Sequence, residues 1–323
     1  MSTRPTRILV IRFSSIGDVL LTAPALVSLR AAIHGPCEIH FLTKSTMRPV
    51  AEGFGALVDG IHTIDRATSE VTEVLKAAEI DYIVDLHSNV RSRAIKRAIG
   101  CVAFTLKKEN LAKWMLVRGW QKRPVAHIVE RYIDSFRGAF GANTPDAWPA
   151  IFESAVLPSG FDRSAGPWEI IAVGAAHTGK QMPLKLMQSL ILNAQANGHR
   201  TVLIGGNGDA ETGGILSKGF DDSVVNLVGK TSIGESAALI RAAERAYSGD
   251  TGMMHLAAAM GTPVTSIWGC TRPSLGMSPW RPTDGSIAIL PERRDPMRPC
   301  SKLGNHCRFN GESECMHQHT FAS

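Results

Sequence analysis

Short apolar runs alternate with longer segments of helical periodicity along the chain. The runs at 8–13, 38–43 and 81–87 are rich in apolar and β-branched residues, as expected of strands buried in a parallel sheet. Segments whose apolar residues recur at helical spacing follow them, for instance at 19–33 and 69–79. A strand–helix alternation of this kind predicts a doubly wound α/β domain.

The alternation lapses between about Asn143 and Trp168, where four prolines occur, and then restarts. The second half repeats the pattern, with predicted strands at 169–176, 201–206, 224–229 and 263–269 and predicted helices at 185–198, 235–246 and 252–260. We therefore predict two Rossmann-like domains, residues 1–155 and 156–323, that face each other across a cleft. In such folds ligands bind at the carboxyl ends of the strands.

Composition narrows the class of protein only modestly. The 323 residues are 44% hydrophobic and 20% charged, and the formal net charge of +6 favours anionic partners. Charge or glycine interrupts every apolar stretch before the roughly 18 residues that a membrane span needs. The N-terminal sequence MSTRPTR is polar and does not predict a signal peptide, so we expect a cytoplasmic location.

Two glycine-rich turns are candidates for contact with an anionic ligand. The segment 205–208 follows a predicted strand, and the segment 249–252 opens a predicted helix. Glycine lets the backbone approach a ligand closely, and free N–H groups at the start of a helix favour anions. Neither turn forms G-x-G-x-x-G after the first strand, and no P-loop motif occurs, which disfavours an NAD-binding domain or a P-loop ATPase.

Six motifs in order resemble the ADP-heptose:lipopolysaccharide heptosyltransferases, glycosyltransferase family 9. They are SSIGDVLLTAPAL from Ser14, VDLHSNVRS from Val84, GAAHTGKQMP from Gly174, VLIGGNGDAE from Val202, NLVGKTSIGESAALIRAA from Asn226 and GDTGMMHLAAAMGTPVTSIWGCTRP from Gly249. The resemblance implies a GT-B fold and inverting transfer of heptose from an ADP-heptose donor to the lipopolysaccharide inner core. It implies no required cofactor and no metal in the mechanism.

The resemblance assigns two catalytic residues. Asp18, in S-x-G-D, matches the family's base, which would take the proton of the acceptor hydroxyl as it attacks the anomeric carbon. The alternative is that Asp18 only caps the helix that follows. Lys180 matches the lysine that would meet the departing diphosphate, where cationic charge is needed without a metal. Met182 departs from the family, which commonly has tryptophan there.

The resemblance also implies two sets of binding residues. The donor set lies in the second half: Thr178, Gly179, Gly205, Gly206, Glu211, Lys230, Thr231, Asp250, Thr251, Gly252 and His255. For His255 a packed, hydrogen-bonded histidine is an equal alternative. The acceptor set lies in the first half: Ser14, Ser15, Gly17, Lys44, Arg91 and Arg93.

The segment 91–123 is strongly basic, with ten Lys or Arg against one acidic residue, and Trp114 and Trp120 are interleaved. A solvated charged face is the plain alternative, and nucleic-acid binding is disfavoured because no recognised module is present. We favour a surface for the phosphorylated, lipid-linked acceptor, with peripheral contact to the inner face of an anionic membrane.

The six cysteines do not predict a disulfide framework in a chain of this length. Cys37, Cys101 and Cys270 are scattered and predict small core residues. Cys300, Cys307 and Cys315 cluster near the end, with His306, His317 and His319 nearby. Reduced packed thiols are favoured there, and a zinc site and a disulfide stay open, because the spacing matches no recognised zinc motif.

Two alternatives to heptosyl transfer remain on sequence alone. One keeps the fold and uses another nucleotide-sugar donor. The other is a non-catalytic protein that binds a nucleotide sugar or a lipid.

Overall fold

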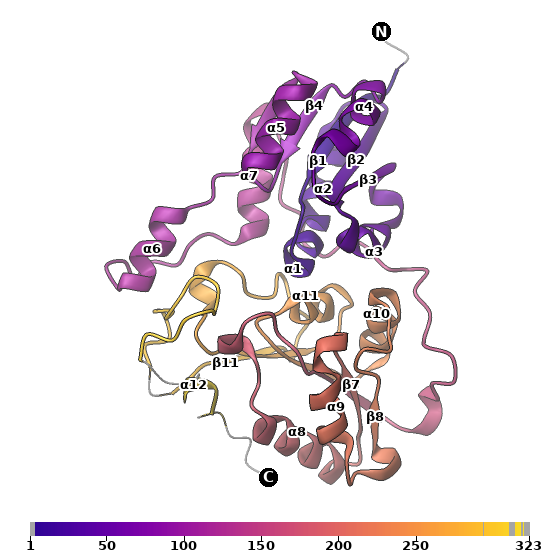
Figure 1. The fold of residues 1–323 in the computed structure, drawn as a ribbon, viewed down its shortest axis with the longest axis vertical. Helices are drawn as coiled ribbons and strands as arrows, with labels where there is room; N and C mark the ends of the chain where they lie inside the picture. Colours follow the sequence, from indigo (N-terminus) through magenta and orange to yellow (C-terminus); the bar gives the residue numbers. More distant parts are fainter. Residues whose placement is uncertain (1–3, 293, 310–313, 318, 320–323) are drawn as a thin grey trace. The chain divides into compact units, whose positions relative to one another are not determined.

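The computed structural model describes residues 4–292, 294–309, 314–317 and 319. Contacts divide the chain into two units, each with its own parallel sheet (Figure 1). Unit 1 comprises Met1–Glu109 and Ala126–Ser154, and unit 2 comprises Asn110–Val125 and Ala155–Ser323. The sequence prediction kept 110–125 with the first domain, whereas these contacts group it with the second.

The sheet of unit 1 has the order β3-β2-β1-β4-β5, and all its strands are parallel. Its strands are β1 (Thr6–Ile11), β2 (Cys37–Lys44), β3 (Gly60–Ile64), β4 (Tyr82–Asp85) and β5 (Val102–Thr105). Ile8 of β1 pairs with Ile39 on one side and Tyr82 on the other. The chain runs outward from β1 to β2 and β3 and then resumes at β4, so the strand order reverses beside β1.

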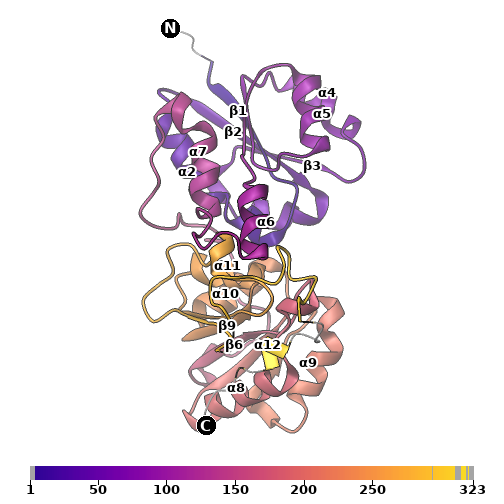
Figure 2. The same cartoon turned by 90° about the vertical axis from the view of Figure 1, so that its left-hand side faces the viewer.

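Helices cover both faces of this sheet (Figure 2). The helices of unit 1 are α1 (Ile16–Leu20), α2 (Ala23–Ala32), α3 (Arg48–Glu52), α4 (Ser69–Ala77), α5 (Val90–Ile99) and α7 (Ile128–Phe140). The pair α4 and α5 lies on one face, over a buried layer that includes Leu9, Ile11 and Ile83, and α2 packs with α7 on the other. The single helix predicted over 19–33 is in fact α1 followed by α2, and Pro24 lies in the first turn of α2, where proline is well tolerated.

The sheet of unit 2 has the order β11-β10-β9-β6-β7-β8, again all parallel. Its strands are β6 (Trp168–Ala172), β7 (Arg200–Ile204), β8 (Val224–Asn226), β9 (Arg245–Gly249), β10 (Val264–Ile267) and β11 (Ile287–Ile289). Its helices are α6 (Asn110–Arg118), α8 (Leu184–Ala196), α9 (Ala210–Ser217), α10 (Ile233–Ala242), α11 (Gly252–Ala259) and α12 (Glu314–His317). The strand order reverses between β6 and β9.

Two parts of the sequence prediction need correction here. The helix predicted over 235–246 ends at Ala242, and residues 245–249 form β9 instead. This short segment carries no apolar run of its own, and its position between β6 and β10 makes it a central strand. The edge strands β5 and β11 were also missed, because both are short and partly exposed. Among the described residues, no helix has both the length and the apolar character that crossing a bilayer requires.

Candidate active site

Asp18 lies in the first turn after β1, at the third position of α1. Its Oδ2 accepts hydrogen bonds from the backbone N–H of Ser15, at 3.2 Å, and from the Ser15 hydroxyl, at 3.0 Å. Ser15 is the N-cap of α1, so the two residues form a capping box. The capping role considered from the sequence is therefore present, and it occupies one carboxylate oxygen.

Arg12 holds the other oxygen of Asp18. A terminal guanidinium nitrogen of Arg12 lies 2.6 Å from Asp18 Oδ1. The same guanidinium donates to the carbonyl oxygens of Ser14, at 2.9 Å, and Leu86, at 2.7 Å. Sequence reasoning missed Arg12, although one signal was available: it is the charged residue inside the apolar run at 8–13, where a buried charge needs a partner.

These contacts set the charge state of Asp18. Burial raises the pKa of its carboxyl group, whereas the Arg12 charge and the hydrogen bonds from Ser15 lower it, and the net pKa lies below the usual value. The carboxylate is thus ionised at neutral pH. Its side chain is 23% exposed. Among the residues that the structure describes, Arg12 is the only donor to Oδ1, which leaves that oxygen a lone pair for a further donor.

His87 and Tyr132 complete the surroundings of Asp18. The hydroxyl of Tyr132 donates to the backbone oxygen of Asp18 at 3.3 Å, and the Arg12 guanidinium lies 5.7 Å from the centre of the same ring. His87 follows β4, and its ring meets Phe13 edge-on at 5.1 Å. Burial, then the charges of Arg12 and Lys108, lower the pKa of His87 to about 4, so this imidazole is neutral at pH 7.

The predicted acceptor residues lie at or just after the carboxyl ends of strands β1, β2 and β4 of unit 1. Lys44 ends β2, next to β1, and its backbone N–H donates to Phe13 O at 3.3 Å. Arg91 is half-buried and Arg93 exposed in the first turn of α5, which follows β4. Ser14 is half-buried, whereas Gly17 is buried and offers only backbone. Because the strands are parallel, their carboxyl ends bring these residues to the same side of the sheet as Asp18.

Lys180 and Asp250 form an ion pair in unit 2. Lys180 Nζ lies 2.8 Å from Asp250 Oδ2, and the two side chains are 20% and 7% exposed. Lys180 ends a short turn, Thr178–Lys180, after β6, and Asp250 follows β9 directly. Because β6 and β9 are neighbours where the strand order reverses, the pair lies at the position where open α/β sheets bind ligands.

Gly179 fixes the backbone beside Lys180. Its N–H donates to Gly304 O and its carbonyl accepts from the Cys270 N–H, both at 3.1 Å. A Cβ at Gly179 would lie 2.5 Å from Gly304 O and 2.8 Å from Cys270 Sγ, so no side chain fits. A side chain is also excluded at Gly249, because a Cβ added there would lie 2.3 Å from Lys180 O. Met182, where the family commonly has tryptophan, is buried in the hydrophobic core.

Asp209, which sequence reasoning missed, organises the glycine-rich turn after β7. Its carboxylate accepts from Gly206 N–H at 2.9 Å and lies against Gly174, where a Cβ would be 1.9 Å from Asp209 Oδ2. Gly205 is half-buried beside this carboxylate, whereas Glu211 is exposed on α9. The two glycine turns after β6 and β7 are therefore joined by one side chain.

The remaining predicted donor residues range from exposed to buried. Thr178 and Lys230 are exposed, and Lys230 Nζ donates to Asn226 O at 3.0 Å. Thr231 Oγ1 lies 2.9 Å from Ser236 Oγ. Thr251 is the N-cap of α11, and its hydroxyl accepts from the Met253 N–H at 3.3 Å; Gly252 is the first residue of that helix. His255 is only 2% exposed, so its ring lies inside the fold.

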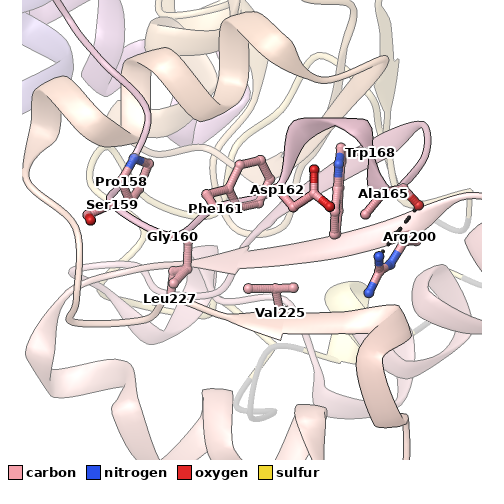
Figure 3. A pocket seen from close by; sticks show the side chains of 10 residues that line it. All are labelled: Pro158, Ser159, Gly160, Phe161, Asp162, Ala165, Trp168, Arg200, Val225 and Leu227. Atoms are coloured by element: carbon pink, nitrogen blue, oxygen red, sulfur yellow. Dashed lines mark hydrogen bonds between the residues drawn. The ribbon is translucent and has the colours of Figure 1, made fainter.

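A separate pocket of about 350 Å³ lies elsewhere in unit 2 (Figure 3). Its lining includes Trp168 and Arg200, the first residues of β6 and β7, and the Arg200 guanidinium lies 4.7 Å from the Trp168 ring centre. These are the amino ends of the strands, opposite to the ends that carry Lys180 and Gly205. The pocket is therefore distinct from the candidate donor site.

Two parallel-sheet α/β units with charged and glycine-rich turns at the strand carboxyl ends define the chain as a GT-B type glycosyltransferase fold. Residues 69–303 match the family described as "Glycosyltransferase family 9 (heptosyltransferase)", and the chain belongs to that family. The fold class and the family expected from the motifs are both confirmed, and the chain is a glycosyltransferase.

Curated and solved relatives agree with this assignment. Lipopolysaccharide heptosyltransferase 1 of Escherichia coli K12 is 25% identical over 288 residues, which cover 83% of this chain and 89% of that protein. A glycosyltransferase family 9 structure from Veillonella parvula matches with a TM-score of 0.72 and 20% identity, covering 88% of this chain and 85% of that one. The structure of E. coli heptosyltransferase WaaC with ADP matches with a TM-score of 0.69 and 24% identity, covering 92% and 96%.

Proposed function

We propose that the protein transfers heptose from an ADP-heptose donor to an acceptor hydroxyl of the lipopolysaccharide inner core, with inversion at the anomeric carbon. The observation that carries the proposal is the Lys180–Asp250 pair at the strand-order reversal of unit 2, within a chain of the heptosyltransferase family. E. coli WaaC, a relative of the same fold, has been solved with ADP.

Unit 2 would bind the donor. The diphosphate gains negative charge as its bond to the sugar breaks, and the Lys180 ammonium would stabilise that charge. Backbone N–H groups at the start of α11 favour the same phosphates. Asp250 would then exchange part of its contact with Lys180 for sugar hydroxyls. No cofactor or metal takes part in this step.

Unit 1 would supply the base. The acceptor oxygen forms a bond to the anomeric carbon while the bond from that carbon to the diphosphate breaks, and ADP leaves with the electron pair. The acceptor's proton passes to Asp18, for which Oδ1 has the free lone pair. Arg12 keeps the carboxylate ionised before the step, although a lowered pKa also makes it a weaker base. Lys44, Arg91 and Arg93 would attract phosphates of the acceptor.

The segment 110–125 offers a surface for peripheral membrane contact at the cytoplasmic face of the inner membrane. Leu111, Trp114 and Trp120 are 68%, 44% and 71% exposed, and the two indole rings meet edge-on at 4.8 Å. Exposed cations accompany them: Arg118, Lys122 and Arg123. Aromatic rings beside cations suit the boundary between acyl chains and anionic head groups.

Mass-spectrometric detection of transfer onto phosphorylated Kdo–lipid A tests the proposed activity, with ADP-, GDP- and UDP-sugars offered in parallel. We expect a heptosylated product from ADP-heptose alone. Preference for a non-adenine donor would make the protein a different glycosyltransferase. Nucleotide-sugar binding without turnover from any donor would make it a binding protein.

Vesicle co-sedimentation tests the membrane contact. We expect binding to phosphatidylglycerol-containing vesicles and weaker binding to phosphatidylcholine alone. The Trp120→Ala variant should bind less, whereas Trp280→Ala, which alters a buried tryptophan elsewhere, should bind as wild type if it folds. Equal binding of Trp120→Ala and wild type would contradict the proposed surface.

A further inference from the structure

Four cysteines of unit 2 pack together in one cluster. The Sγ atoms of Cys270, Cys300 and Cys307 lie within 4.8 Å of one another. Cys315, in α12, belongs to the same buried cluster, and its thiol is within hydrogen-bonding contact of Cys270. Cys270 follows β10, far from the tail in sequence, so the scattered core cysteine predicted there is in fact a member of the tail cluster.

The spacing of the sulfurs suits one tetrahedral metal ion. A zinc–thiolate bond of about 2.3 Å places the sulfurs of a tetrathiolate about 3.8 Å apart. The sulfurs of Cys270, Cys300 and Cys307 lie within a spread that includes this spacing. An iron–sulfur cluster would hold its thiolates on different iron atoms and hence farther apart. All six cysteines are free, so no disulfide competes for these thiols.

Backbone hydrogen bonds hold the cluster together. The N–H groups of Cys300 and Ser301 both donate to Cys270 O, at 2.8 and 3.3 Å. The backbone N–H of Arg308 donates to the Cys300 sulfur. In metal sites, hydrogen bonds to the ligating residues orient those ligands toward the ion.

A buried cation supplies a second, independent observation. Arg272 is 0% exposed, and its guanidinium donates to the carbonyl oxygens of Thr271 and Gly269. Among the described residues, its Nε has no hydrogen-bond partner. The side chain interacts electrostatically with Cys315, Cys300 and Cys270. A buried cation needs a counter-charge, and four thiolates around a divalent ion carry a net charge of two minus.

Neither His306 nor His319 is placed as a ligand of the cluster. His306 is exposed, and the Nε2 atom of His319 lies 3.0 Å from Trp268 O. The side chain of His317 lies outside the described residues. Four cysteine thiols are by themselves enough ligands for a tetrahedral ion.

We infer that Cys270, Cys300, Cys307 and Cys315 bind one Zn²⁺ or Fe²⁺ ion as a tetrathiolate. Four protein ligands leave no open position, so the ion is structural and takes no part in the transfer step. It fastens the tail to the end of β10. Since the Cys270 N–H and Gly304 O hold Gly179 from both sides, the site also fixes the turn that presents Lys180, a consequence that depends on the proposed function.

Elemental analysis of the full-length protein, purified under reducing conditions from medium containing both metals, tests the site. We expect one zinc or iron ion per chain, and the element found distinguishes the two. Cys270→Ser and Cys307→Ser should lose at least half of the metal, whereas Cys101→Ser, in unit 1, should keep it. Metal retained by both cluster variants would overturn the assignment.

Two readouts on the wild-type protein cover the case in which the variants do not fold. A thiol-reactive mercurial should displace the ion, which a chelating dye then binds. The amount of metal released should rise in proportion to the number of thiols modified. Protein stripped of metal should take up one Co²⁺ with the absorption of a tetrahedral thiolate complex. Two results would refute the site. One is a folded, reduced protein that contains no metal and takes up neither Co²⁺ nor Zn²⁺. The other is a native disulfide between two of the four cysteines. None of these measurements depends on transferase activity.

Discussion

The ammonium group of Lys180 lies 2.8 Å from the carboxylate of Asp250, and the pair joins the turns after β6 and β9. Both groups are largely buried, so each needs the other while no ligand is bound. A diphosphate would compete with Asp250 for the ammonium. In the proposed donor site, this exchange would keep the ammonium group paired with a negative charge both with and without bound donor.

Replacing Lys180 should slow the chemical step more than it weakens binding. We expect Lys180→Gln to lower kcat about 10²- to 10³-fold, because the charge that develops on the leaving diphosphate loses its cation. Steady-state kinetics with ADP-heptose measures this. The matched control is Lys185→Gln, an exposed lysine of α8, which should behave as wild type. Unchanged kcat in Lys180→Gln would exclude the assigned role.

The base assigned to Asp18 predicts a specific pH profile. Since the pKa of Asp18 lies below its usual value, kcat/KM should not fall from its protonation between pH 5 and 8. Asp18→Asn should lower kcat about 10²- to 10⁴-fold at every pH. Arg12→Gln removes the charge that lowers the pKa of Asp18, so the acid limb of the profile should move to higher pH. An acid limb that stays in place would show that Arg12 does not set the charge of the base.

His87 should make stability depend on pH. Its pKa is lowered to about 4 in the folded state, chiefly by burial, against the usual 6.5. The unfolded chain therefore binds more protons between these values, and the free energy of unfolding should decrease as pH falls from 6.5 toward 4. Urea unfolding at several pH values should show a shallower decrease in His87→Gln. His34→Gln, at an exposed position, should retain the wild-type slope.

Gly179 should not tolerate even a methyl group. Its Cβ would lie 2.5 Å from a backbone oxygen, so Gly179→Ala should cost about 1–3 kcal/mol of unfolding free energy, measured by urea denaturation. Gly208→Ala is the matched control, because a Cβ there meets nothing within 4 Å. A neutral Gly179→Ala would mean that the turn before Lys180 can shift freely.

Removal of the proposed metal should weaken nucleotide binding. The ion is not expected to touch the ligand, but its loss frees the backbone on both sides of Gly179. We expect the Kd for ADP, measured by calorimetry, to rise about tenfold, which corresponds to about 1.4 kcal/mol. Chelator treatment should raise the Kd of Cys270→Ser less than it raises the Kd of the wild type, because the variant holds less metal beforehand. An unchanged Kd in metal-free protein would show that the cysteine site does not influence nucleotide binding.

The sequence by itself determined the architecture and the positions of the main candidate residues. Strand and helix periodicity is a local property, because side chains of one element share the same buried face, and it predicted two parallel α/β halves. It failed for β9 and for the edge strands β5 and β11, whose structure depends on neighbouring strands. The family motifs placed Asp18, Lys180 and Asp250.

Only the tertiary structure decided which of these groups meet. Arg12 reaches Asp18 because the turn after β1 folds back on the strand end, and Lys180 reaches Asp250 because β6 and β9 are adjacent in the sheet although distant in the chain. Cys270 joins the tail cysteines for a similar reason, since β10 ends where the tail packs. The contact of Lys180 with Asp250 depends on the order of the strands in the sheet, which no local pattern of residues records.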